Sequence, residues 1–248
     1  MKILYSILYL LYKIYACILL VVTAILFFPS LAITSKKEKY FHHTHKLFVW
    51  WSRIYMFLIG WRLHVKKSQT LPDGPYIIVA NHASYADIFV TPALFHKLPH
   101  IFLGKSEILT YPLVKHYFRK YHVPVFRDNK LKAAKSLIHA RKKLEQGWSL
   151  IIFPEGGIPD NVRPTMIPFK DGAFKLAKDM NIPILPVTFQ NNYKLFTDPT
   201  DIFGSCTPGI SKVIFHPIID QKELAEKTVE EIKDKAFKLI NDSLPKIK

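Results

Sequence analysis

A histidine and an aspartate, His82 and Asp87, stand five residues apart directly after the apolar run 76–80. An imidazole acts as a general base when its tautomer is fixed, and a carboxylate that accepts the other ring N–H fixes it. Five residues correspond to about 500° of rotation, so one continuous helix would place the two side chains on different faces. A strand ending before His82 and a helix beginning near Asp87 would bring them together across a turn. We therefore predict a catalytic pair, against the alternative of a helix cap and a surface contact.

A second apolar run, 149–153, leads into an acidic, glycine-containing turn with Glu155 and Gly156. We expect this turn to lie at the same edge of a parallel sheet as His82. The Glu155 carboxylate can accept a hydrogen bond from an acceptor hydroxyl, and Gly156 lets the backbone approach a ligand closely. The alternative is a strand-to-loop turn with a surface acid.

Two cations follow other apolar runs, Arg127 after 123–126 and Lys105 after 101–104. The planar fork of Arg127 suits a headgroup phosphate, whereas a surface ion pair there would contribute only about 0 to 1 kcal/mol. Lys105 would add positive charge for the same anion. Both residues are therefore candidate substrate-binding groups.

The order of these motifs resembles that of the glycerolipid acyltransferase superfamily, typified by bacterial lysophosphatidic acid acyltransferases. Residues 81–87 match its His-x4-Asp motif, and 153–156 match the start of its Phe-Pro-Glu-Gly-Thr-Arg motif. Arg127 stands for the arginine of its acceptor motif, and 184–187 resemble its last motif. The resemblance covers residues 70 to 190 or thereabouts. It implies transfer of a fatty acyl group from acyl-CoA or acyl carrier protein to a lysophospholipid, with lysophosphatidate as first choice and no further cofactor.

One departure concerns the acceptor. Gly157 and Ile158 stand where the family usually carries Thr-Arg, so an arginine that helps hold the acceptor phosphate is missing from its place. Arg163 is a candidate replacement. Another lysophospholipid or a lyso-aminolipid is therefore an alternative acceptor. A non-catalytic lipid-binding protein is a further alternative, disfavoured because His82 and Asp87 are both retained.

Other reactive residues fit less well. Ser84 lacks the flanking glycines of a nucleophile elbow. The two cysteines, Cys17 and Cys206, give no disulfide framework and no sign of a thiolate nucleophile. The histidine-rich stretch 42–45 is expected to face a headgroup layer rather than to bind a metal, so we predict no metal site.

The net charge of +16, from 35 basic and 19 acidic side chains, suits either nucleic acid or an anionic membrane. Residues 14–34 carry no charged side chain and are long enough to cross a bilayer core of about 30 Å. We therefore predict an anionic membrane as partner and no nucleic acid. Pro29 leaves a re-entrant hairpin open as an alternative to a full span.

Lysines 36, 37 and 39 follow this segment and place the rest of the chain on the cytoplasmic side of the cell inner membrane. The aromatic stretch 47–62 suits the headgroup boundary, although packing inside the domain is an alternative. We assign residues 1–66 to a helical anchor and 67–248 to an acyltransferase domain. The basic stretch 130–143 is either a docking face for acidic carrier protein, coenzyme A or lipid, or a solvated helix face.

Apolar runs alternate with helical stretches beyond residue 70. Such alternation predicts an α/β fold with a mainly parallel central sheet flanked by helices, preceded by an N-terminal membrane-anchoring helical segment. Asp128 or Asn129 would cap the third helix, Gly147 would end it, and 191–210 would form a surface loop. The predicted strands are 75–81, 101–105, 123–127, 149–154, 182–190 and 211–218, and the predicted helices 88–96, 107–120, 130–146, 171–180 and 221–243.

Overall fold

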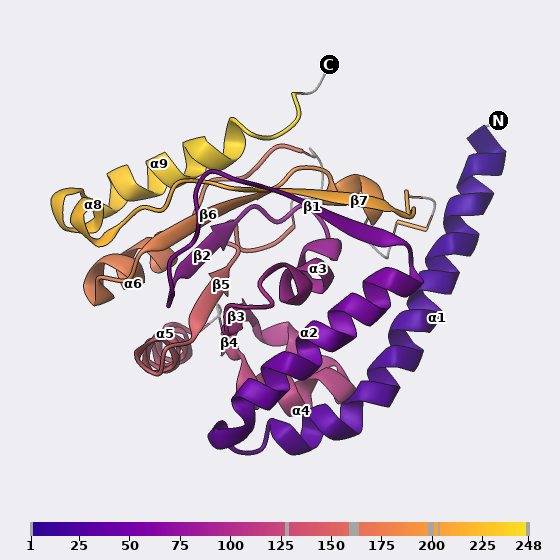
Figure 1. Ribbon diagram of the computed structural model, residues 1–248, viewed down its shortest axis with the longest axis horizontal. Coiled ribbons are helices and arrows are strands. Elements are labelled where there is room, and N and C mark those ends of the chain that lie inside the picture. Colours follow the sequence, from indigo (N-terminus) through magenta and orange to yellow (C-terminus); the bar gives the residue numbers. More distant parts are fainter. Residues whose placement is uncertain (1, 127–128, 159–163, 198–200, 203, 247–248) are drawn as a thin grey trace.

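The computed structural model describes residues 2–126, 129–158, 164–197, 201–202 and 204–246. They contain a seven-stranded sheet with the order β1-β7-β6-β2-β5-β3-β4 (Figure 1). The strands from β6 to β4 along this order are parallel, whereas β7 runs antiparallel to β6 and parallel to β1. The predicted α/β fold with a mainly parallel sheet is confirmed. The strands are β1 Trp61–Lys67, β2 Ile77–Ala80, β3 His100–Lys105, β4 Val123–Val125, β5 Ser149–Ile152, β6 Ile184–Phe189 and β7 Gly209–Phe215.

Strand β1 lies mostly within residues 1–66, which are predicted to form the anchor. It pairs with β7 from Trp61 to Lys67. At this edge of the sheet one face of the strand is exposed, so Arg62, His64 and Lys66 alternate with more buried neighbours. This polar alternation resembles a strand with one solvated face and not the continuous apolar runs of the central strands.

Helices cover both faces of the sheet (Figure 1). Ile77 and Val79 of β2 belong to one hydrophobic core, which includes residues of α4, α5, α6, α8 and α9. The alternate residues Ile78 and Ala80 belong to a second core, which includes residues of α2 (Phe41–Leu58) and α3. Side chains alternate along a strand, so every central strand contributes to two cores. The helices are α3 Ala86–Leu94, α4 Pro112–Tyr121, α5 Lys130–Glu145, α6 Gly172–Met180, α7 Asn192–Leu195, α8 Gln221–Glu226 and α9 Val229–Asn241, with 3₁₀ turns η1 Glu38–Tyr40 and η2 Ser106–Thr110.

Local end signals set several helix boundaries. The Asn129 side chain accepts the backbone N–H of Lys132 over 2.9 Å and caps α5, as predicted. Gly147 follows α5 with φ +86°, a conformation that glycine adopts without strain. The helix predicted over 221–243 is instead two helices, because the Thr228 capping box starts α9 after α8 has ended.

The first two helices form an antiparallel hairpin against the sheet domain (Figure 1). Helix α1 spans Lys2–Thr34 and continues through Pro29, and α2 spans Phe41–Leu58. Within the described part of the chain, α1 alone is long and apolar enough to cross a membrane by length and composition. Contacts between the helices include the Trp51 indole N–H, which donates to Thr23 Oγ1 over 2.9 Å.

The sequence allows two alternatives for the stretch 47–62, packing inside the domain and a place at the headgroup boundary, and helix α2 has features of both. Phe48 and Tyr55 lie on its buried face against the domain. Trp50 and Phe57 are 60% and 82% exposed on its outer face. The helix is therefore part of the packed structure and also presents large aromatic side chains outward.

Candidate active site

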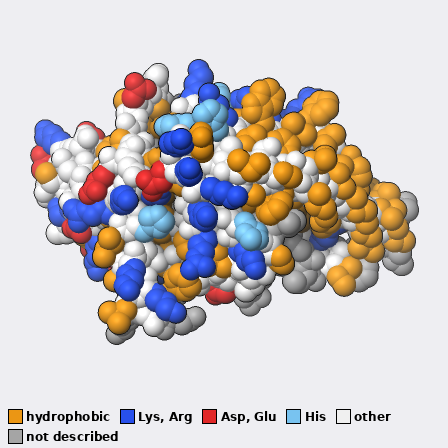
Figure 2. All heavy atoms as spheres, turned by 90° about the horizontal axis from the view of Figure 1, so that it is seen from below, with side chains coloured by type: hydrophobic (Ala, Val, Ile, Leu, Met, Phe, Trp, Pro, Cys, Tyr) orange, Lys and Arg blue, Asp and Glu red, His pale blue; other side chains and the backbone are white. Residues whose placement is uncertain are grey.

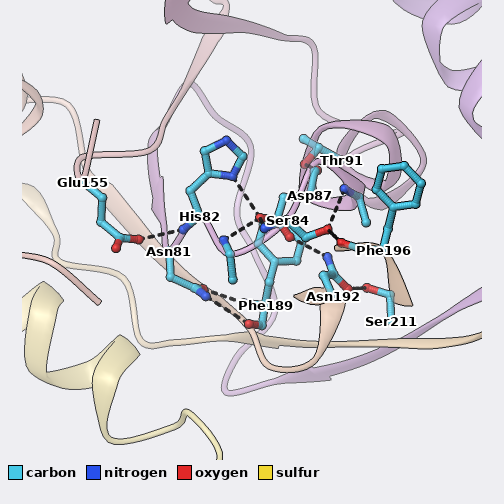
Figure 3. A network of polar contacts seen from close by, with 12 residues as sticks. Asn81, His82, Ser84, Asp87, Thr91, Glu155, Phe189, Asn192, Phe196 and Ser211 are labelled. Atoms are coloured by element: carbon cyan, nitrogen blue, oxygen red, sulfur yellow. Dashed lines mark hydrogen bonds and ion pairs between the residues drawn. The ribbon is translucent and has the colours of Figure 1, made fainter. Parts of the chain in front are cut away.

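The turn between β2 and α3 brings the predicted pair together. Strand β2 ends at Ala80 and α3 begins at Ala86, so His82 lies in the turn and Asp87 in the first helical turn. His82 Nδ1 lies 2.9 Å from Asp87 Oδ2 (Figure 3). With its Nδ1–H donating to the carboxylate, the imidazole keeps Nε2 as its basic nitrogen.

The Asp87 carboxylate is completely buried and accepts hydrogen bonds from several donors. Its Oδ2 also accepts the backbone N–H groups of Ala83 and Ser84 over 2.9 and 3.0 Å. Its Oδ1 accepts Nδ2 of Asn192 over 2.7 Å. These hydrogen bonds fix the carboxylate in place at the positive end of α3. The arrangement therefore suits a carboxylate that stabilises an imidazolium.

The His82 ring is also held from its face. It stacks on Phe153, with ring centroids 4.1 Å apart and an interplanar angle of 18°. The His82 side chain is 12% exposed, so the ring is confined but reachable. Phe153 ends the second apolar run, and the sequence alone assigned it no such role.

Glu155 ties the second turn to the first. Its Oε1 accepts the backbone N–H of His82 over 2.7 Å, and its Oε2 accepts that of Ile167 over 3.0 Å. Burial raises the pKa of this carboxyl to about 7, although the two N–H donors oppose that rise. The geometry shows a positioning contact, and binding of an acceptor hydroxyl stays a prediction. Gly156 follows with φ +88°, which favours glycine.

Of the three predicted cations, Lys105 lies in the part of the chain that the structure describes. Lys105 ends β3 and pairs with Glu107 over 3.0 Å, and both side chains are about half exposed. Arg127 and Arg163 lie outside the described residues.

One asparagine and one serine side chain stabilise the turn. Asn81 exchanges hydrogen bonds with the backbone of Phe189, as donor over 3.0 Å and as acceptor over 2.8 Å. Ser84 Oγ donates to the carbonyl of Phe196 over 2.5 Å and accepts the N–H of Ala86 over 3.0 Å. Ser84 is buried, so its hydroxyl serves the structure of the turn.

The histidine-rich stretch splits between different surroundings. His45 Nε2 lies 3.2 Å from His100 Nδ1 inside the domain, whereas the His42 ring stacks on Trp148. Among the residues that the structure describes, no group of three or more histidine, cysteine or acidic side chains is arranged to hold a metal ion.

Comparison with known proteins agrees with this geometry. The chain is 28% identical to a 1-acyl-sn-glycerol-3-phosphate acyltransferase of Chlamydomonas reinhardtii, over 70% of this chain and 50% of that protein. It is 28% identical to the enzyme of that name from Saccharomyces cerevisiae, over 84% of this chain and 64% of the relative. The chain therefore spans half to just under two thirds of these curated relatives.

A solved structure extends the similarity to the whole fold. The crystal structure of the 1-acyl-sn-glycerophosphate (LPA) acyltransferase PlsC from Thermotoga maritima is 25% identical and superposes with a TM-score of 0.73. The alignment covers 98% of this chain and 95% of that one. Residues 62–190, which include His82, Asp87 and Glu155, match the model of the family described as Acyltransferase. The chain belongs to this acyltransferase family.

Proposed function

We propose that the protein moves a fatty acyl group from acyl-CoA or acyl carrier protein to the hydroxyl of a lysophospholipid, with lysophosphatidate as the first acceptor. The observation that carries this proposal is the contact between His82 Nδ1 and the buried Asp87 carboxylate. It supplies an oriented base at the carboxyl end of a parallel sheet, where such folds bind ligands. The names of the relatives support the choice of acceptor.

The reaction needs one base and no covalent enzyme intermediate. His82 Nε2 takes the proton of the acceptor hydroxyl while the hydroxyl oxygen attacks the carbonyl carbon of the thioester. The C–S bond then breaks, and the imidazolium returns the proton to the leaving thiolate. Asp87 stabilises the imidazolium in between. The buried Ser84 hydroxyl already donates to a carbonyl, which argues against an acyl-serine route. No cofactor beyond the thioester is required.

A different lyso-lipid is the second candidate for the acceptor. The observation that favours it is Gly157-Ile158 in place of the expected Thr-Arg. Arg127 and Arg163 are the candidate phosphate ligands in the sequence. A lysophospholipid with a substituted headgroup, or a lyso-aminolipid, would use the same His82 base.

We further propose that the α1–α2 hairpin attaches the enzyme to a membrane. Helix α1 contacts the domain as well as α2: Lys13 donates to the Asp201 carbonyl over 2.6 Å, Phe28 packs on His116 of α4, and the Tyr55 hydroxyl of α2 donates to the Ala16 carbonyl over 3.2 Å. A helix held this way lies along the domain, which favours a hairpin in the membrane interface over an isolated span. Its outward side chains are Tyr5, Ile7, Leu8, Leu11, Ile14, Tyr15, Ile18, Val21, Val22, Ile25, Leu26 and Ile33.

The charge beside α1 suits an anionic lipid surface. Figure 2 shows apolar side chains at one end of this face and Lys, Arg and His side chains next to them. A hollow on α4 of about 330 Å³ is lined by Leu109, Lys115, His116, Arg119 and Lys120. We propose that the face meets the cytoplasmic leaflet of the inner membrane, whose anionic lipids attract basic residues. Salt-sensitive binding to phosphatidylglycerol vesicles, and weaker binding to phosphatidylcholine, would test this placement.

The experiment that tests the activity is acyl transfer by the purified full-length protein in detergent. Labelled acyl-CoA and acyl carrier protein would each be offered with lysophosphatidate, lysophosphatidylethanolamine and monoacylglycerol, with H82A as the control. Formation of labelled phosphatidate by the wild type alone supports the first acceptor. Transfer only to another lyso-lipid supports the second candidate, and no transfer by the wild type contradicts an acyltransferase function.

A further inference from the structure

The second oxygen of Asp87 is held from outside the segment that matches the family. Asn192, the first residue of α7, donates its amide Nδ2 to Asp87 Oδ1 over 2.7 Å (Figure 3). Both residues are 0% exposed, so solvent does not compete for this hydrogen bond. A buried carboxylate oxygen without a donor is costly, which gives this bond a large influence on the position of Asp87.

Ser211 completes the arrangement from β7. Its hydroxyl donates to Asn192 Oδ1 over 2.6 Å, and Ser211 is also fully buried. A donor at the amide oxygen directs the amide nitrogen to the other side, where the Asp87 carboxylate accepts. In the reversed amide, two oxygens would face each other. The amide orientation is therefore determined at both of its ends.

The two oxygens of Asp87 thus have separate tasks. Oδ2 serves the turn, with His82 Nδ1 and two backbone N–H donors within 3.0 Å, and Oδ1 serves Asn192. We propose that Asn192, oriented by Ser211, is a positioning residue for acyl transfer. It holds the carboxylate in the rotamer that receives the His82 N–H, and it draws some negative charge away from that contact. This inference rests on the proposed function of the site.

The test compares the full-length wild type with N192A and N192D in the detergent assay. N192A is expected to lower kcat by about tenfold to a hundredfold, because a small misplacement of a catalytic group slows the reaction. The KM should change little. The acid limb of its kcat–pH profile should move to higher pH, because Asp87 without its donor stabilises the imidazolium more strongly. In N192D the new carboxyl can donate only when protonated, so the activity of N192D relative to the wild type at the same pH should rise as the pH falls.

A matched control lies next to Asn192. The Asn191 side chain donates to the Ile210 carbonyl and accepts the N–H of Lys212, each over 2.8 Å. It therefore joins α7 to β7 without touching Asp87. N191A should keep the wild-type kcat and pH profile. An equal loss in N191A and N192A would overturn the inference, because loosening of α7 would then explain both.

Ser211 variants give a second, milder test. S211A should lower kcat less than N192A, and S211T, which keeps the hydroxyl, should retain wild-type activity. If N192A does not fold, the two Ser211 variants test the inference in its place. Equal activity of S211A and S211T would overturn the proposal that the Ser211 hydroxyl orients the Asn192 amide.

A readout without substrate separates this inference from the proposed function. Nitrogen-15 NMR of the His82 ring, assigned by comparison with H82Q, reports which nitrogen carries the proton. If the wild type transfers no acyl group but N192A changes the His82 tautomer, the proposed function fails and the positioning role stands. If N192A changes neither kcat nor the His82 signals, the positioning role is overturned.

Discussion

His82 and a group of buried histidines lie at opposite ends of the parallel strands and have contrasting surroundings. His82 follows the carboxyl end of β2 and contacts the Asp87 carboxylate. His100 begins β3 and lies 3.2 Å from His45, while His122 Nδ1 accepts the Phe102 N–H over 3.1 Å. The two settings share the residue type and differ in the hydrogen-bond partner of the ring and in its exposure.

Burial has a clear electrostatic consequence in the histidine group, defined as His45, His100 and His122. It lowers the pKa of His45 to about 3 and that of His100 to about 4, and holds the pKa of His122 well below its usual range. These rings are therefore neutral at physiological pH and serve packing. A histidine in this fold is therefore a candidate base when a carboxylate lies beside its ring and when the ring is exposed enough for a substrate to reach it.

The largest effect is expected at His82. H82Q should lower kcat by about 10⁴-fold, because the general base is lost, and should leave thermal unfolding close to that of the wild type. Labelled acyl transfer and a melting curve measure the two quantities. The matched change in the histidine group, H45Q, should keep activity at pH 7.5. An active H82Q would remove the proposed mechanism.

Asp87 is expected to rank second. D87N should lower kcat by about 10³-fold, because an amide nitrogen facing Nδ1 favours the wrong tautomer. The loss should persist with saturating acceptor, since the substrate site is untouched. Kinetics over a range of acceptor concentrations would check this. A change confined to KM would instead assign Asp87 to acceptor binding.

The histidine group should make the protein sensitive to acid. The folded-state pKa of His100 is below its unfolded value of 6.5, so the unfolded chain binds more protons below that pH. The free energy of unfolding should fall as the pH drops from 6.5 towards 4, by about 3 kcal/mol for His100 alone. Urea unfolding in detergent across this range measures it. H100Q should flatten the slope, and an unchanged slope would contradict the buried neutral state.

Glu155 should act with the opposite sign and a smaller effect on activity. Its folded-state pKa of about 7 exceeds the unfolded value of 4.5, so the stability that its neutral form provides is lost as the pH rises from 4.5 through 7. E155Q should remove this dependence. It should also lower kcat by about tenfold, because one of the two backbone N–H bonds is weakened and His82 is less well placed. Parallel unfolding and activity profiles of E155Q and wild type would show whether the two effects occur together.

Much of the fold was predictable because its signals are local. The apolar runs gave the central strands, Asn129 and Gly147 marked the ends of α5, and the composition of α1 marked it as a candidate membrane helix. The His82–Asp87 contact was predictable for the same reason, since five residues across a strand-to-helix turn leave few arrangements. The edge strand β1 was placed with the anchor, because alternating polar residues on a half-exposed strand carry a weaker signal.

Tertiary structure alone determined which side chains hold His82 and Asp87 in position. Asn192 reaches Asp87 across 105 positions of sequence, from a segment expected to be a surface loop, and Phe153 stacks on His82 from the next strand of the sheet. Glu155 binds backbone groups from two separate segments. Residue type and spacing alone determined which groups could do the chemistry. Which side chains hold them in place depended on strand order and packing, because hydrogen bonds between distant segments leave no periodic pattern in the sequence.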